Sequence, residues 1–355
     1  MAKEKLHEMK NTPSSFQLRG VITGTKSQRF YKNGSGKNGT SWNALEFGVK
    51  IAENKTVYVS MRGFPRDEVF YYKKGENGAK GTTQKVAWKD RKKSPGKDFR
   101  LIGVTVSTGK DEEGKNVNEI FTEYDAIECL HKSLSDGESV FVKGNLQFSS
   151  YEDRNGQTRR KIELVPNQIS YTNEPVDFNA DDHKEMCEFE NTLVFQSIEQ
   201  EMDENDKKTG RFILSGYSIG YNSVENVSFI LKEDCAKLAG NIKKAMRPGY
   251  SIKTFGRVEV INDISTIQED DSGWGETSPM ERINSPTRRE YIVYRADPSS
   301  IEKEDYSEAT IAEAIRKIKA SKAATENFGE KANNNDDVND DWSMDDDDSD
   351  ESPWD

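Results

Sequence analysis

Residues 125–169, DAIECLHKSLSDGESVFVKGNLQFSSYEDRNGQTRRKIELVPNQI, contain the pattern that decides the fold of this chain. Ile127, Leu130 and Leu134 are spaced as one apolar face of a helix, and Gly137 can supply the left-handed backbone that ends one. Val140, Val142, Leu146 and Phe148 then recur at every second position on either side of Gly144, which predicts a strand. The Asn-Gly pair at 155–156 predicts the turn of a hairpin, with a return strand up to residue 165.

A helix followed by a long two-stranded hairpin forms the second half of a five-stranded Greek-key barrel. The Asp-Gly pair before the first strand and the hairpin up to residue 169 make this segment similar to the OB-fold of the single-stranded DNA-binding proteins of bacteria and phages. This resemblance implies a barrel that binds single-stranded DNA (ssDNA). The alternating segments 16–25, 42–51 and 55–64 predict the three strands of its first half.

The same order of elements returns after residues 171–187, whose composition is typical of a linker. Strands are expected at 193–200, 210–218, 226–231, 250–260 and 289–296, with a helix at 234–246, and this repeat predicts a second barrel. We therefore expect a mainly β fold with two tandem OB-fold-like Greek-key barrels, a C-terminal helix and a disordered acidic tail. The expected limits are 14–172 for barrel 1, with a basic, aromatic insertion at 65–123, then 187–302 for barrel 2, 305–326 for the helix and 327–355 for the tail.

Charge is distributed unevenly along this 355-residue chain, whose formal net charge is −12. Residues 14–171 hold 27 Lys and Arg against 19 Asp and Glu, whereas residues 187–302 hold 14 against 20. Residues 336–355 hold 11 acids and no base. This asymmetry predicts a polyanion-binding domain joined to an acidic arm. Residues 1–13 are polar and are expected to form a loose arm.

No pattern in the sequence supports catalysis. The chain lacks the GxxxxGK[ST] phosphate loop, the GxSxG nucleophile motif and the HExxH zinc motif, so no enzymatic activity is expected. Its three cysteines and three histidines do not cluster, and neither a metal site nor a cofactor is predicted. The sequence also lacks a membrane-spanning apolar run and a signal peptide. These features predict a cytoplasmic protein, located in the host cytoplasm if a phage encodes it.

Binding of unstructured nucleic acid needs exposed aromatic rings, on which bases stack, and cations that follow the phosphates. Arginine suits the second task because its planar guanidinium both pairs with phosphate and stacks. In the insertion, residues 73–100 carry ten Lys and Arg against three acids, interleaved with aromatic residues. The predicted ssDNA-binding residues are Arg29, Phe30, Tyr31, Trp42, Tyr58, Arg62, Phe64, Trp88, Lys89, Arg91, Lys92, Lys93, Phe148, Tyr151, Arg154, Arg159 and Arg160.

Several of these side chains have an alternative structural role. By its place in the alternation Tyr58 could belong to the core, Phe148 could be half-buried, and the basic insertion could be a solvated loop. Arg159 and Arg160 are adjacent, so they point to opposite faces of a strand and only one of them can face a groove. Tyr151, at the hairpin tip, has little core to join.

The C-terminal residues DDVNDDWSMDDDDSDESPWD place apolar side chains among carboxylates. A solubility tail would explain the acids alone. The tail of the family that the chain resembles combines acids with a few apolar residues and docks on replication, recombination and repair proteins, so the resemblance implies such partners, although this chain ends in Asp355 instead of an apolar residue. The predicted partner-binding residues are Trp342, Asp345, Asp346, Asp347, Asp348, Trp354 and Asp355.

The predicted function is therefore that of a non-enzymatic protein of phage or bacterial type, which coats and protects ssDNA during DNA replication, recombination or repair. Self-association into a homo-oligomer is compatible with this function. Two alternatives stay open. A structural or assembly scaffold of a phage would not respond to oligo-dT, and a single-stranded RNA-binding protein would be distinguished by competition between oligo-dT and oligo-U.

Overall fold

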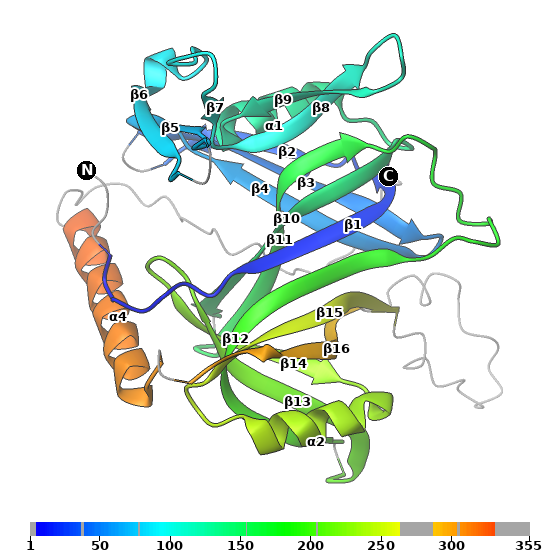
Figure 1. Cartoon of the computed structure of the whole chain (residues 1–355), viewed down its shortest axis with the longest axis vertical. Helices are drawn as coiled ribbons and strands as arrows, with labels where there is room; N and C mark the ends of the chain where they lie inside the picture. The colour runs from blue at the N-terminus through cyan, green and yellow to red at the C-terminus, as the bar shows by residue number, and fades with distance from the viewer. Residues whose placement is uncertain are drawn as a thin grey trace. The chain divides into compact units, whose positions relative to one another are not determined.

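The computed structural model describes residues 5–36, 39–76, 79–153, 155–203, 205–262, 287–303 and 306–330, and the chain divides into two compact units (Figure 1). Barrel 1 consists of Pro13–Thr192 and Thr254–Arg257. The described residues of barrel 2 lie within 5–12, 193–253, 258–262, 287–303 and 306–330. The predicted partner-binding residues of the acidic tail, Trp342, Asp345 to Asp348, Trp354 and Asp355, lie in 331–355, outside the described residues. Arg154 is also outside the described residues.

Barrel 1 has the strand order of an OB-fold. Its five barrel strands are β1 (Ser14–Thr23), β3 (Ser41–Ala52), β4 (Lys55–Gly63), β10 (Ser139–Glu152) and β11 (Thr158–Tyr171), with helix α1 (Glu123–Ser133) before the fourth. The antiparallel order is β4-β3-β1-β10-β11. Ser60 Oγ of β4 lies 3.4 Å from Glu163 Oε1 of β11, so the third and fifth strands adjoin and the Greek-key barrel closes.

The core of barrel 1 follows from alternation along the strands. Leu18, Val49, Val57 and Val142 are buried, and each is flanked by a residue that points outward. Helix α1 buries Ala126, Ile127 and Leu130 against β3 and β4. The helix begins at Thr122, whose Oγ1 accepts from Asp125 N at 3.2 Å, and the chain turns at Gly137 with φ of 92°.

The insertion between β4 and α1 is folded as two parts. The first is a sheet of order β6-β5-β7, from β5 (Glu68–Lys73), β6 (Thr82–Ala87) and β7 (Arg100–Leu101), with a 3₁₀ turn η1 (Trp88–Asp90). The second is a hairpin of β8 (Val104–Lys110) and β9 (Asn116–Phe121), and β8 pairs in parallel with β11. In addition to the five barrel strands, a short strand, β2 (Tyr31–Ser35), pairs with β3.

Three hairpin turns are stabilised by the same kind of side-chain to backbone hydrogen bonding. Asp111, Asp153 and Asp203 each accept two backbone N–H bonds from residues two and four positions later. At the β10–β11 tip, the bond from Gln157 N and the guanidinium of Arg159 lower the pKa of Asp153 below its ordinary value. Gly156 completes this turn with φ of 73°, as the Asn-Gly pair predicts.

Barrel 2 repeats the plan as a fully paired barrel. Its strands are β12 (Met186–Met202), β13 (Lys208–Ile219), β14 (Val224–Leu231), β15 (Ser251–Asn262) and β16 (Thr287–Glu302). They pair in the cyclic order β12-β13-β14-β16-β15, with β14 and β16 parallel. The 3₁₀ turn η2 (Glu233–Cys235) leads into α2 (Ala236–Ala245), which lies against β13 and β16 (Figure 1). The fold is therefore mainly β, with two tandem OB-fold-like barrels, as predicted.

The limits of the two units differ from those expected. Residues 173–192 were divided between a linker and barrel 2, but they pack in barrel 1: Lys55 Nζ lies 2.8 Å from Glu185 Oε1, and His183 Nε2 lies 3.1 Å from Ile51 O. The first residues of β12 pair with β1, from Met186 opposite Arg19 onward. The boundary lies inside β12, where composition gives no signal.

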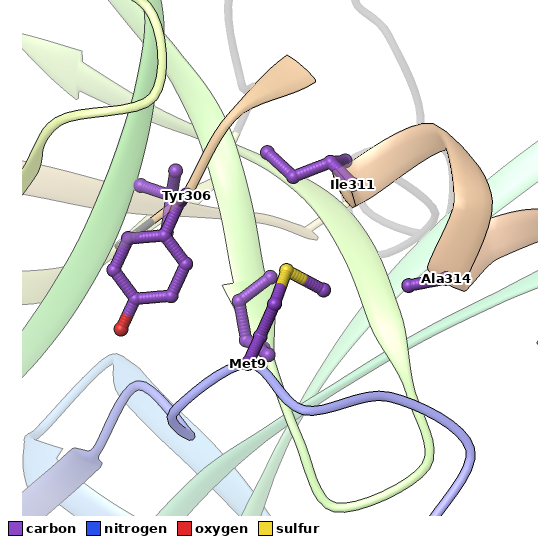
Figure 2. Close-up of a cluster of buried hydrophobic side chains, with 6 residues drawn as sticks. Met9, Tyr306, Ile311 and Ala314 are labelled. Carbon is purple, nitrogen blue, oxygen red and sulfur yellow. The ribbon is translucent and has the colours of Figure 1, made fainter. Parts of the chain in front are cut away.

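Both ends of the described chain pack on barrel 2. Met9, Val194, Ile219, Tyr306, Ile311 and Ala314 form a buried cluster, in which Met9 lies beside Tyr306 and Ile311 (Figure 2). Tyr306 Oη donates to Lys10 O at 3.2 Å, and Thr12 N donates to Ile219 O at 2.8 Å. The expectation of a loose arm is therefore wrong for residues 5–12. The C-terminal helix, α4 (Glu308–Glu330), is present and runs four residues past its predicted end.

Candidate nucleic-acid interface

The outer side of β3 and β4 is the part of an OB-fold where oligonucleotides commonly bind. Here the cross-strand register pairs Ala44 with Arg62 and Gly48 with Tyr58, which places Arg62 and Tyr58 outward. Tyr58 is 50% exposed, so its alternative role in the core is excluded. Phe64, directly after β4, is 46% exposed.

Trp42 lies at the edge of the same side. It pairs with Gly34 of β2, and a Cβ atom placed on Gly34 would lie 2.7 Å from Trp42 Cζ2. The indole therefore packs directly on the glycine backbone and is half-buried.

One side of the β10–β11 hairpin continues this outer surface. Tyr151 pairs with Arg159, Ser149 with Lys161 and Gln147 with Glu163, and these pairs alternate along one side of the hairpin. Because Glu163 accepts from Ser60 of β4, this side adjoins the outer side of β4. We call the residues Trp42, Tyr58, Arg62, Tyr151, Arg159 and Lys161 the aromatic face. It combines exposed rings with cations on one sheet surface.

Five other predicted residues do not lie on the aromatic face. Phe30 is a core residue at 4% exposure and cannot stack on a base, and Tyr31 faces inward, opposite Leu45, with its ring stacked on His131 at 4.1 Å between centroids. Phe148 and Arg160 face the other side of the hairpin, because they alternate with Tyr151 and Arg159. Arg29 is exposed in the turn before β2.

In the insertion, Arg91 has a structural partner. Its Nε lies 2.7 Å from Asp125 Oδ2 and its Nη2 lies 2.9 Å from Asp125 Oδ1, so the guanidinium binds the carboxylate of α1 with two bonds. The guanidinium also covers the Trp88 ring at 4.4 Å, and Trp88 makes an edge contact with Tyr124. Arg91 and Trp88 thus fix the insertion to α1, which is a structural role for both side chains.

Asp125 is a buried carboxylate held ionised by this pair. Burial by itself would raise its pKa, but the hydrogen bonds from Arg91 and Thr122 and the charge of Arg91 outweigh it, so the pKa lies below the ordinary value of 3.8.

The three predicted lysines near Arg91 differ from it in their surroundings. Lys89 and Lys92 are exposed, and Lys93 pairs with Asp90 at 2.8 Å.

Two exposed rings of the insertion were not among the predicted residues. Phe70 and Tyr72 point outward from β5, because Val69 and Tyr71 between and beside them are buried. Lys85 Nζ lies 5.7 Å from the Phe70 ring. The alternation of residues 68–73 was the available signal, but four aromatic and apolar residues in a row obscured which of them face outward.

The corresponding strands of barrel 2 carry a different surface. Ser215 pairs with Ser228 and Tyr217 with Asn226 across β13 and β14, and Tyr217 packs against the cluster that holds α4. In the part of the chain that the structure describes, no group of three or more His, Cys, Asp and Glu side chains could hold a metal ion. No described helix combines the length and the apolar character that a membrane crossing requires.

Comparison with known proteins gives one family and several weak structural similarities. The sequence profile of the YorF family matches residues 73–331, well over half of the chain. A comparison with curated proteins found no match.

Two similar solved structures are of the single-stranded DNA binding protein from Thermus aquaticus. A deletion mutant is 10% identical, with 84% of this chain and 98% of that chain covered and a TM-score of 0.38. The wild-type protein is 9% identical, with 81% and 93% covered and a TM-score of 0.37. A Plasmodium falciparum SSB complex with ssDNA is 9% identical, with 47% and 97% covered and a TM-score of 0.19. With TM-scores this low, these similarities carry no argument about function.

We expect Asp125→Asn to destabilise barrel 1 by about 3 kcal/mol at neutral pH, because it leaves the Arg91 guanidinium without its carboxylate. A carboxyl whose pKa is lowered by folding stabilises the fold above its unfolded pKa and loses that contribution as the pH falls through the folded value. The difference in unfolding free energy between wild type and variant should therefore shrink as the pH falls below about 4. Urea unfolding at a series of pH values measures it. A gap that stays constant with pH would contradict this role. Asp98→Asn, which removes an exposed pair with Lys73, is the control and should cost less than about 1 kcal/mol.

Proposed function

The chain belongs to the YorF family, and we propose that it is a non-enzymatic protein that binds and coats ssDNA through barrel 1. The observation that carries this proposal is the aromatic face, where the rings of Tyr58 and Tyr151 and the cations Arg62 and Arg159 share the outer side of one OB-like barrel. The similar solved structures are of single-stranded DNA-binding proteins, which agrees with the proposal without adding weight to it.

Stacking selects a single strand over a duplex. Each base that stacks on an aromatic ring contributes about 1–3 kcal/mol, and it must leave its own stack to do so. Every base has such a surface, so the contacts tolerate any sequence. The hydroxyl of Tyr58 stands outward on its strand, opposite a glycine, so the ring is not screened by a side chain at that paired position.

The distribution of charge favours barrel 1 over barrel 2 as the DNA-binding unit. Residues 14–171 have a net charge of +8 and residues 187–302 one of −6, so a phosphate chain is attracted to the first and repelled by the second. Arg159 pairs with Asp153 at 2.8 Å and Lys161 with Glu163 at 3.2 Å, and both pairs are partly exposed, so phosphate can reach these cations and exchange for the carboxylates. Barrel 2 would then serve spacing or self-association.

The acidic tail has a separate role in this proposal. Its 11 carboxylates and two tryptophans at 336–355 suit docking on basic, apolar surfaces of replication, recombination and repair proteins. The same carboxylates can occupy the basic surface of barrel 1 and compete with DNA at low salt, where such attraction is least screened.

Replacement of Tyr58 by alanine tests the aromatic face. We expect Tyr58→Ala to weaken binding of oligo-dT by about tenfold, because one stacking contact of roughly 1–2 kcal/mol is lost. Fluorescence titration with the full chain gives the affinity. Tyr221→Ala, at an equally exposed tyrosine of barrel 2, is the matched control and should bind as the wild type does. Equal affinities for all three proteins would refute the aromatic face, and stronger competition by oligo-U would favour RNA as the ligand.

Truncation after Glu330 tests the tail. The shortened chain keeps α4 and should bind oligo-dT more tightly than the full chain at about 0.01 M salt, where the Debye length is about 30 Å. The difference should fade towards about 1 M salt, where the Debye length is about 3 Å. An affinity that is unchanged at low salt would remove the competition between tail and DNA.

A further inference from the structure

A groove of 590 Å³ lies in barrel 1, away from the residues assigned above to the aromatic face. It is bounded by the end of the 3₁₀ turn, by β7 and by the outer side of the β8–β9 hairpin. The lining residues that matter for its chemistry are Lys92, Arg100, Leu101, Thr105, Asn118 and Ile120. Its volume is in the range that holds a nucleotide-sized ligand.

Hydrogen-bond donors dominate the polar part of the groove. Asn118 Oδ1 accepts from Ser107 Oγ at 2.6 Å, and no other bond to this carboxamide occurs among the described residues, so its NH₂ group is left to donate. Arg100 has no acidic partner in the part of the chain that the structure describes. No carboxylate lines the groove. The arrangement favours an anion.

The charge of Lys92 is also left over for a ligand. Its Nζ lies 4.0 Å from Asp125 Oδ1, but that carboxylate already accepts two bonds from Arg91 and one from Thr122. The Lys92 side chain is 75% exposed. Because Arg91 neutralises Asp125, the groove keeps the positive charge of both Lys92 and Arg100.

Part of the groove lining is apolar. Leu101 pairs with Tyr71 of β5, and Ile120 pairs with Thr105 of β8 and is 37% exposed. An exposed apolar wall beside two cations matches a ligand with a phosphate at one end and a flat, weakly polar ring at the other, which is the chemistry of a nucleotide.

We propose that this groove binds one nucleotide of the DNA strand, with its phosphate on Lys92 and Arg100 and its base on Leu101 and Ile120. The inference rests on the proposed function and adds a second contact to it, supplied by the insertion. Thr105 and Asn118 would donate to the phosphate or to base carbonyl groups.

The test is a salt series with oligo-dT of about 30 nucleotides, long enough for more than one OB-fold contact. The double variant Lys92→Gln/Arg100→Gln removes two cations, so the log–log salt slope should become shallower by about 1.4, and the affinity should fall about tenfold near 0.1 M salt. Asn118→Leu removes an uncharged donor. It should lower the affinity by roughly threefold and leave the slope unchanged.

The matched control is Lys80→Gln/Lys97→Gln, which removes the same charge from exposed lysines of the insertion that do not line the groove. Its slope should stay close to that of the wild type. Equal changes in both double variants, or none in either, would overturn the groove as a site while leaving the proposed function intact. A wild-type chain that binds no oligo-dT would overturn both.

Discussion

The two-residue period of β3 and β4 is the constraint on which the candidate site depends. Leu45, Phe47, Val57 and Val59 are buried inside barrel 1, and every second residue is forced outward. A shift of β4 by one residue would bury Tyr58 and expose its valine neighbours, at about 1.5–3 kcal/mol for each large apolar side chain. The packing that stabilises the barrel therefore also holds the rings and cations in water.

A second, local interaction shapes the insertion. Arg91 joins it to α1 through Asp125, and the Arg91 carbonyl accepts from Tyr71 Oη at 2.7 Å, so one residue connects the helix, the 3₁₀ turn and β5. This connection holds Lys92 beside a carboxylate that is already neutralised. The basic residues of the insertion thus have two roles. Arg91 holds the insertion against α1, and neighbours such as Lys92 keep their charge at the surface.

The strands of both barrels could be predicted from sequence because a period of two leaves a clear record in residues such as Val140, Val142, Leu146 and Phe148. The same period turns Tyr58 and Arg62 outward, although the alternation in the sequence left a core role open for Tyr58. Phe30 and Tyr31 could not, because whether a loop residue joins the core depends on which helix lies beneath it, and here α1 supplies His131. Arg91 differs from Lys92 only through a partner 34 residues away. Met9 packs on Ile311, a contact that no local pattern encodes.

The salt dependence of oligo-dT binding by the full chain tests the aromatic and basic surface of barrel 1 most directly. Each phosphate that a cation neutralises releases counterions, so about five such contacts give a log–log slope near −3.5 on a single strand. Saturable binding with a slope of about this size is the predicted result. Binding that is absent, or that has a slope near zero, would contradict the assignment of ssDNA to barrel 1.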